Sequence, residues 1–410
     1  MLNQNFTGKN LLKNVTIVDI IKHKLGRDRE EYLATLNMVA DSINNGGNDF
    51  PDIHMSRHHG KEIYKLKNLE SIYSLKHISK IITRIYKVKQ TNRETITRQI
   101  ITLLEDSSNF TIIKGDIKNF FDSISSEKIL DKVTKDRLLS YRGRSIVKNL
   151  FQCDQVKTKG LPRGLSISTP LSELYIRDFD RYVKEIPGVY YYARYVDDFI
   201  IFTHKEKKSV LDEIKIKLSE LNLDLNESKI KCISLSSLKN ERSSFDFLGY
   251  SYKILEQCEK NHVVIGISDR RIRKIKTRII LTILAYSNDK NIALLKSRFM
   301  FISGNYALST SSKKHDKKLM AGFYYNNKLA NNEKQISELD RFTMKLLTSR
   351  KGGFYRKLGA AELEKITSAV KGLTFKNGFD YRKKFEFGIK NINKVTECWK
   401  MESAYEKRKR

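Results

Sequence analysis

Two adjacent carboxylates, Asp197 and Asp198, are the residues whose types and spacing most directly suggest chemistry. They lie between Val189–Tyr192 and Phe199–Phe202, two segments with the aromatic and β-branched composition of strands, so we expect a β-hairpin with the acids at its turn. Two anions side by side are costly unless a cation neutralises them, so the pair requires a metal ion or a basic partner. The alternative is a plain turn, because Asp is common in turns.

A third carboxylate, Asp116, ends the short apolar segment Phe110–Asp116, which we expect to be a strand followed by a helix. It precedes Asp197 by 197 − 116 = 81 residues. Carboxylates on two neighbouring strand ends can hold two Mg²⁺ ions about 3.5–4 Å apart for phosphoryl chemistry. Taken alone, Asp116 is better interpreted as a helix N-cap.

Between these acids lies a basic, glycine-containing segment, KTKGLPRGLSISTPLSELYIRDFDRYV. We expect a tight loop followed by a helix over Leu171–Tyr182. Glycines let a backbone approach a base pair or a phosphate closely, and hydroxyls can contact a template backbone. A simple loop-to-helix connection is the alternative. The residues that carry the nucleic-acid interpretation are Gly160, Pro162, Arg163, Gly164, Ser166, Ser168 and Thr169.

The segments after the hairpin offer further cations. We expect a helix over Lys207–Leu221, then a strand-turn-strand stretch over Leu223–Lys231 that presents Lys229, either as a general acid for departing pyrophosphate or as a solvated lysine. Phe245–Tyr250 is predicted to be a second, aromatic turn. From Ser268 onward the pattern is helical and very basic, which suits contacts with a nucleic-acid backbone.

The amino-acid composition indicates which class of molecule the protein binds. Among 410 residues, 78 Lys and Arg against 47 Asp and Glu leave a net charge of +31, with 40% hydrophobic residues. This predicts a folded protein with a strong positive field whose natural partner is nucleic acid, and no apolar run favours a membrane. The N-terminus lacks an apolar signal core, so we expect a cytoplasmic protein whose scattered cysteines, Cys153, Cys232, Cys258 and Cys398, are reduced.

The N-terminal third is predicted to be mostly helical. Apolar residues recur three and four apart over Val15–Ile43, and Lys61–Leu104 has a helical, basic pattern. The histidines at 54, 58 and 59 have no acidic or cysteine partner at metal-binding spacing, so a polar loop or a phosphate contact is the better interpretation.

The ordered set GDIKNFFD, GLPRGLSISTPL, YVDD, LNLDLNESK and FLGY resembles the motifs A to E of bacterial reverse transcriptases. The resemblance covers Ile112–Tyr250. It implies an α+β right-hand polymerase, with N-terminal helices and fingers at 1–110, a palm with an antiparallel sheet at 111–255, and a helical, basic thumb and C-terminal region at 256–410. It also implies nucleotidyl transfer with two Mg²⁺ ions, or Mn²⁺ in their place.

The same resemblance assigns roles to residues. Asp116, Asp197 and Asp198 would bind the metals, with the backbone of Ile117 as a further ligand, and Lys229 would be the catalytic lysine. Phe121 would exclude a ribose 2′-hydroxyl and so select dNTPs, with Gly164 beside the nucleotide and Arg93 or Arg98 on its triphosphate. Template and primer contacts would come from Gly160, Pro162, Arg163, Ser166, Ser168, Phe247, Leu248, Gly249, Arg271, Lys274 and Lys276.

Arg163 departs from the glutamine of many relatives, and the GLSIS wording looks most like the abortive-infection, defence-associated group. The leading hypothesis is therefore an RNA-directed DNA polymerase with an antiviral role, bound to a noncoding RNA template. A second defence protein or another copy of the chain is a further expected partner. The alternatives are a retron or group II intron-type enzyme and a non-catalytic nucleic-acid-binding protein that keeps the palm as a scaffold. Priming mode and oligomeric state do not follow from the sequence.

Overall fold

The computed structural model describes residues 2–46, 50, 52–58, 60–235, 242–255, 261–308 and 319–400. The chain forms two compact units, and each is described by itself. The first comprises Met1–Ile96 and Ser108–Ser236, and the second comprises Thr97–Ser107 and Ser237–Arg410. Helix α5 (Arg93–Leu104) runs from one into the other. The division into fingers, palm and thumb stays a prediction.

A four-stranded antiparallel sheet with the order β4-β5-β3-β6 is the centre of the first unit. Its strands are β3 (Phe110–Asp116), β4 (Val189–Tyr195), β5 (Asp198–Thr203) and β6 (Lys231–Leu235). In β5 every residue from Phe199 to Thr203 is buried, as expected of a central strand covered on both faces. The predicted β3 strand, the predicted hairpin and the α+β class are confirmed.

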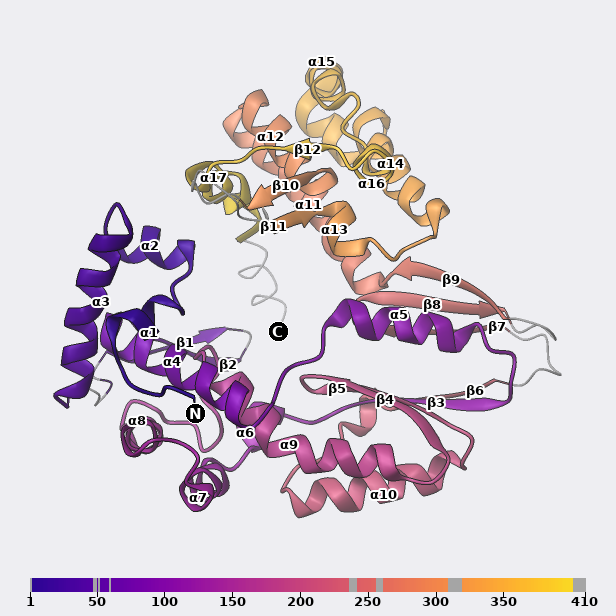
Figure 1. Cartoon of the computed structure of the whole chain (residues 1–410). Helices are drawn as coiled ribbons and strands as arrows, with labels where there is room; N and C mark the ends of the chain where they lie inside the picture. The colour runs from indigo at the N-terminus through magenta and orange to yellow at the C-terminus, as the bar shows by residue number, and fades with distance from the viewer. Residues whose placement is uncertain are drawn as a thin grey trace. The chain divides into compact units, whose positions relative to one another are not determined.

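Helices α9 (Ser168–Glu185) and α10 (Lys207–Glu220) lie along one face of this sheet (Figure 1). On α9 the buried side chains Leu171, Tyr175 and Phe179 recur four residues apart, which directs one apolar stripe toward the sheet. On α10 the equivalent stripe is Val210, Ile214 and Leu218. This packing supports the strands that end at the acidic residues.

The N-terminal part of the first unit consists of helices and a small β-hairpin. Its elements are α1 (Gly8–Leu12), α2 (Ile17–His23), α3 (Arg29–Asn44), β1 (His54–His58), β2 (Lys61–Lys65) and α4 (Leu69–Ile85). The helical prediction from Lys61 was wrong for its first five residues, which pair with β1 from His54↔Lys65 to His58↔Lys61. His54 and His58 thus lie at the two ends of a strand, and His59 lies outside the described residues.

Three further helices and one 3-10 turn complete the described part of the first unit. They are α6 (Phe120–Ser123), α7 (Ser126–Asp136), α8 (Tyr141–Gln152) and the 3-10 turn η1 (Glu227–Lys229). The stretch predicted as strand-turn-strand over Leu223–Lys231 instead contains one isolated β-bridge, Ile117↔Leu225, then η1 and the start of β6.

The second unit combines two small sheets with helices. The antiparallel sheet β7-β8-β9 consists of β7 (Arg242–Phe247), β8 (Tyr250–Leu255) and β9 (His262–Ile267), and the sheet β11-β10-β12 consists of β10 (Asn305–Leu308), β11 (Leu319–Gly322) and β12 (Lys384–Phe385). The helices are α11 (Asp269–Asp289), α12 (Ile292–Ser303), α13 (Phe323–Asn327), α14 (Glu333–Thr348), α15 (Gly353–Val370), α16 (Phe375–Asp380) and α17 (Ile389–Lys400). The predicted basic helix from Ser268 is α11.

Within the described residues, no helix combines the length and apolarity needed to cross a membrane. Of the cysteines in the described residues, Cys153, Cys232 and Cys398 form no disulfide bond, and Cys258 lies outside the described residues.

Candidate active site

The pairing of β3 with β5 brings the three acidic residues together at one end of the sheet. Asp116, the last residue of β3, is directly opposite Asp198, the first residue of β5. The amide of Ile117 donates a hydrogen bond to the carbonyl of Asp197 at 3.0 Å. Side chains separated by 81 residues in sequence therefore share one corner of the fold.

The turn that presents Asp197 is strained and braced. Val196 has φ 62°, a left-handed conformation that costs a β-branched residue about 1–3 kcal/mol. Its carbonyl accepts a 2.7 Å hydrogen bond from Nη1 of Arg194. Arg194 is itself buried and forms 2.7 Å ion pairs with Glu173 and Asp180 of α9. Helix α9 thus fixes the hairpin turn through one guanidinium group.

The acids at the turn are crowded by negative charge. Burial and the neighbouring anions Asp197 and Asp116 raise the pKa of Asp198 to about 6. Burial likewise raises the pKa of Asp197, and Asp116 adds to the effect, whereas Lys229 and Lys61 oppose it. Ionisation of the pair is costly in this form of the protein, so a bound cation would be stabilised by the charges that now repel one another.

Asp116 is engaged by two residues from the segment before β6. Its carboxylate is buried and accepts hydrogen bonds from Nζ of Lys229 at 2.9 Å and from Nδ2 of Asn226 at 3.1 Å. The bond to Asp116 raises the pKa of Lys229, so the lysine keeps its proton. Asn226 also donates its backbone amide to the Asp116 carbonyl at 2.8 Å. Sequence reasoning found Lys229 but missed Asn226.

The donor set is suited to a divalent metal ion. Carboxylate oxygens are the ligands that Mg²⁺ and Mn²⁺ prefer, and three of them meet here with too little positive charge to balance them. In the described part of the chain, no three His, Cys, Asp or Glu side chains are already arranged as a metal site. The carboxylate of Asp116 accepts one hydrogen bond on each oxygen, from Asn226 and from Lys229, and each oxygen keeps a lone pair that a metal ion could use.

A cavity of about 690 Å³ lies beside this corner, and we call it the Phe121 cavity. It is lined by His58, Lys61, Ile63, Phe121, Arg163, Gly164, Leu165, Ser166, Ser168 and Thr169. Lys61 also acts electrostatically on Asp197, which links the cavity to the acids. The cavity therefore offers an aromatic surface and cations next to the carboxylates.

Arg163 covers Phe121 inside this cavity. Its guanidinium is 5.2 Å from the Phe121 ring centroid and forms two hydrogen bonds to Asp122, at 2.9 and 3.2 Å. The pair with Asp122 fixes the orientation of the guanidinium over the ring. The residue that departs from the usual glutamine is thus part of the cavity wall.

The loop from Gly160 to Ser166 is held from both sides. A side chain at Gly160 would collide with the carbonyl oxygens of Phe121 and Asp122, at 2.3 and 2.5 Å. Gly164 has φ 94° and lies against β2, where the amide of Tyr64 donates to the Arg163 carbonyl at 2.7 Å. The Ser168 hydroxyl donates to the Pro162 carbonyl at 2.6 Å, which uses its proton within the loop.

The remaining predicted site residues are distributed over both units. Arg93 begins α5 in the first unit, whereas Arg98 belongs to the second. In the second unit, Phe247 is buried, Leu248 and Gly249 form the β7–β8 turn, and the guanidinium of Arg271 packs against Gly249. On α11, Lys274 is exposed and Lys276 lies over the ring of Phe342 at 5.1 Å. Their roles in binding primer, template or nucleotide stay predictions.

Residues 57–252, which carry this site, match the family model described as reverse transcriptase (RNA-dependent DNA polymerase). This part of the chain is therefore similar to the reverse transcriptase domain, the domain of RNA-directed DNA polymerases. No curated protein matches the chain.

Three solved telomerase structures are similar at low identity. The truncated apo telomerase of Candida tropicalis is 15% identical over 52% of this chain and 54% of its own, with a TM-score of 0.35. The Candida albicans telomerase with a fragment of telomeric RNA is 12% identical over 86% and 67%, with a TM-score of 0.35. The apo Candida tropicalis telomerase is 10% identical over 99% and 84%, with a TM-score of 0.38. The chain spans about half of the first, and we draw no conclusion from these likenesses.

Proposed function

We propose that the protein copies an RNA template into DNA by joining dNTPs, with two Mg²⁺ ions or Mn²⁺ at its acidic corner. The observation that carries this proposal is the meeting of Asp116 and Asp198 across β3 and β5 beside Asp197. The matched family model supports the same reaction.

Each residue of the corner has a role in this proposal. The side chains of Asp116, Asp197 and Asp198, with the backbone of Ile117, would hold the metal ions. When bound, such ions activate a 3′-hydroxyl and stabilise the charge of the leaving pyrophosphate. Lys229 keeps its proton through its bond to Asp116, so once released it can donate that proton to the pyrophosphate.

The Phe121 cavity would determine which nucleotides are accepted. Phe121 offers a ring beneath the incoming sugar, and Arg163 together with Asp122 prevents that ring from turning away. Lys61 and His58 from the β1–β2 hairpin stand where a triphosphate would need cations. A ribose 2′-hydroxyl would meet the ring, which favours dNTPs.

Primer extension tests the proposal. We expect the full chain to extend a DNA primer on an RNA template with labelled dNTPs and Mg²⁺, and Asp197→Asn to lose activity by orders of magnitude because the metals become under-neutralised. Equal extension by the two proteins would contradict the assignment. Better incorporation of NTPs than of dNTPs would instead indicate an RNA polymerase.

We also propose an antiviral role with a noncoding RNA as template, a finer assignment supported by the GLSIS wording at residues 164–168. Sequencing the nucleic acid that copurifies with the protein would identify template and product together. If the role is defence, the wild-type gene should lower phage plating and Asp197→Asn should not. Equal plating on both would contradict it.

A further inference from the structure

The segment before β6 is fixed to the segment after β3 through its backbone. The amide of Asn226 donates to the carbonyl of Asp116 at 2.8 Å, and the amide of Lys118 donates to the carbonyl of Asp224 at 2.8 Å. The isolated β-bridge of this segment lies between the two bonds. Backbone pairing alone therefore places Asn226 beside Asp116.

The side chain of Asn226 is held with its amino group toward Asp116. Its Nδ2 donates to Oδ1 of the Asp116 carboxylate at 3.1 Å, and its own Oδ1 accepts from the hydroxyl of Ser228 at 2.8 Å. An ionised carboxylate only accepts hydrogen bonds, so the opposite orientation of the amide would place two acceptors face to face. The hydroxyl of Ser228 and the carboxylate of Asp116 therefore fix one orientation of the amide.

The second partner of Asp116 is held less firmly. Lys229 donates from Nζ to the other carboxylate oxygen, Oδ2, at 2.9 Å, but its side chain is 57% exposed whereas that of Asp116 is 7% exposed. In the proposed function Lys229 leaves Asp116 to protonate the pyrophosphate. Asn226 is short and anchored through its backbone, so it still holds the carboxylate after Lys229 has moved.

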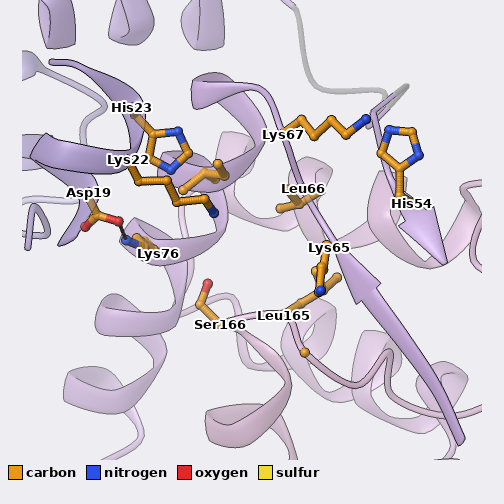
Figure 2. Close-up of a pocket in the computed structure, with 12 residues that line it drawn as sticks. Asp19, Lys22, His23, His54, Lys65, Leu66, Lys67, Lys76, Leu165 and Ser166 are labelled. Carbon is orange, nitrogen blue, oxygen red and sulfur yellow. Dashed lines mark hydrogen bonds and ion pairs between the residues drawn. The ribbon is translucent and has the colours of Figure 1, made fainter. Parts of the chain in front are cut away.

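Another lysine-paired carboxylate of the first unit shows what distinguishes Asp116. Asp19 pairs with Lys76 at 2.6 Å in a cavity that none of the three clustered aspartates lines (Figure 2). Its carboxylate also accepts from the hydroxyl and the amide of Thr16, each at 2.7 Å, and so completes the N-terminal cap of α2. Asp116 instead ends β3 opposite Asp198, and its two bonds leave a lone pair on each oxygen. The same kind of pairing thus stabilises a helix at Asp19 and leaves oxygens available at Asp116.

We propose that Asn226 is a positioning residue for the metal ions: it orients the carboxylate of Asp116 as a ligand, and Ser228 fixes the amide that does so. The inference rests on the proposed function, which assigns the metals to Asp116, and adds a residue to it. A carboxylate that turns freely loses conformational entropy when it becomes a ligand, so holding it in place beforehand raises the metal affinity.

The test is equilibrium binding of Mn²⁺ to the full chain without nucleic acid or dNTPs, measured by electron paramagnetic resonance of the free ion. Asn226→Leu removes the amide at nearly the same volume, and Ser228→Ala removes a hydroxyl at an exposed position. The matched control, Thr16→Val, takes a side-chain donor from the other lysine-paired carboxylate, Asp19. Asp116→Asn is the reference for loss of the ligand itself.

We expect Asn226→Leu to weaken Mn²⁺ binding by about 10- to 100-fold, the usual effect of removing a partner that orients a metal ligand. Ser228→Ala should weaken it by a smaller factor of about 2 to 5, because the amide keeps its donor but loses the bond that fixes its orientation. Thr16→Val should bind as wild type. In extension assays of Asn226→Leu, the Mg²⁺ concentration for half-maximal rate should rise in parallel, whereas the KM for primer–template should stay at the wild-type value.

Wild-type Mn²⁺ affinity in Asn226→Leu or in Ser228→Ala would overturn the proposal, and so would an equal loss in Thr16→Val. Circular dichroism and thermal melting in EDTA show which variants are folded, and Ser228→Ala decides the question if Asn226→Leu is not. The proposed function fails separately. Wild-type Mn²⁺ affinity in Asp116→Asn would refute the metal site itself, whereas the expected binding without any primer extension would refute the polymerase reaction and leave the role of Asn226 intact.

Discussion

The carboxylate of Asp198 is held where burial and two neighbouring anions oppose its ionisation, with a pKa of about 6. We therefore predict that Asp198→Asn raises the melting temperature of the metal-free protein at pH 8, because the substitution removes the repulsion and keeps the shape. The same variant should lose primer extension. Thermal unfolding in EDTA and an extension assay measure the two effects.

The pH dependence gives the check on this prediction. In the folded protein the pKa of Asp198 is above its ordinary value of 3.8, so the folded state binds the proton more tightly and wild type gains stability as the pH falls through about 6. The advantage of Asp198→Asn should shrink from pH 8 to pH 5. Mg²⁺ should stabilise wild type more than the variant, and an advantage that is unchanged at pH 5 would contradict the electrostatic account.

Lys61 lines the Phe121 cavity, and its charge lowers the pKa of Asp197, so we expect it to contact the triphosphate. Lys61→Met should raise the KM for dNTPs by about 10- to 100-fold, the cost of a lost charge-assisted hydrogen bond of about 1.5–3 kcal/mol. Steady-state extension with varied dNTP measures it. Lys148→Met, at an exposed lysine of α8, is the control and should leave KM unchanged.

For individual residues, the sequence could predict which acids form the site but not which side chains contact them. Asp116, Asp197 and Asp198 each adjoin a strongly apolar strand, and that pattern is local. Asn226 bonds a carboxylate 110 residues away, and Arg194 braces a turn through acids on another element. Arg194 is a single arginine within an apolar strand, and that pattern could have indicated a buried ion pair. Only the fold identifies Glu173 and Asp180 as its partners.

At the scale of elements, α9 controls the hairpin turn through Arg194. Removing the guanidinium leaves two partly buried acids without their cation, so Arg194→Met should destabilise the protein by about 3 kcal/mol. It should also lower kcat, because the carbonyl of Val196 loses the bond that holds its strained conformation. Chemical unfolding and extension kinetics measure both.

A compensated variant separates stability from positioning. Adding Glu173→Gln and Asp180→Asn to Arg194→Met removes the unpaired charges, so much of the stability should return while kcat stays low and the KM for dNTPs stays near the wild-type value. If activity recovered together with stability, Arg194 would have only a structural role.

The elements that sequence periodicity predicted well are those whose stripe or alternation is local: α9, α10, α11, β3 and the β4–β5 hairpin. Strand β2 was missed because the alternation of KEIYK is short and runs into a basic helix. Its strand conformation depends on β1 and on the Arg163 carbonyl, which accepts from the Tyr64 amide across the fold. Such long-range pairing has no local signature.

For the whole molecule, composition indicated nucleic acid as the partner, but it did not indicate which elements make each compact unit. The first unit joins Met1–Ile96 with Ser108–Ser236, whereas the segment Thr97–Ser107 belongs with the second. Chain order alone cannot show that a segment which interrupts the first unit in sequence belongs to the second unit.

The net charge of +31 leads to a prediction for the full chain. Binding of RNA should weaken steeply as salt increases, since each phosphate contact releases counterions and adds about 0.7–0.9 to the slope of log K against log salt. Asp197→Asn should bind at least as tightly as wild type without Mg²⁺, because one negative charge is removed from a site that meets nucleic acid. Fluorescence anisotropy from low to high KCl measures both proteins. A slope near zero would mean that the surplus of lysine and arginine does not form the nucleic-acid surface. Weaker binding by Asp197→Asn would mean that the acidic corner lies outside that surface.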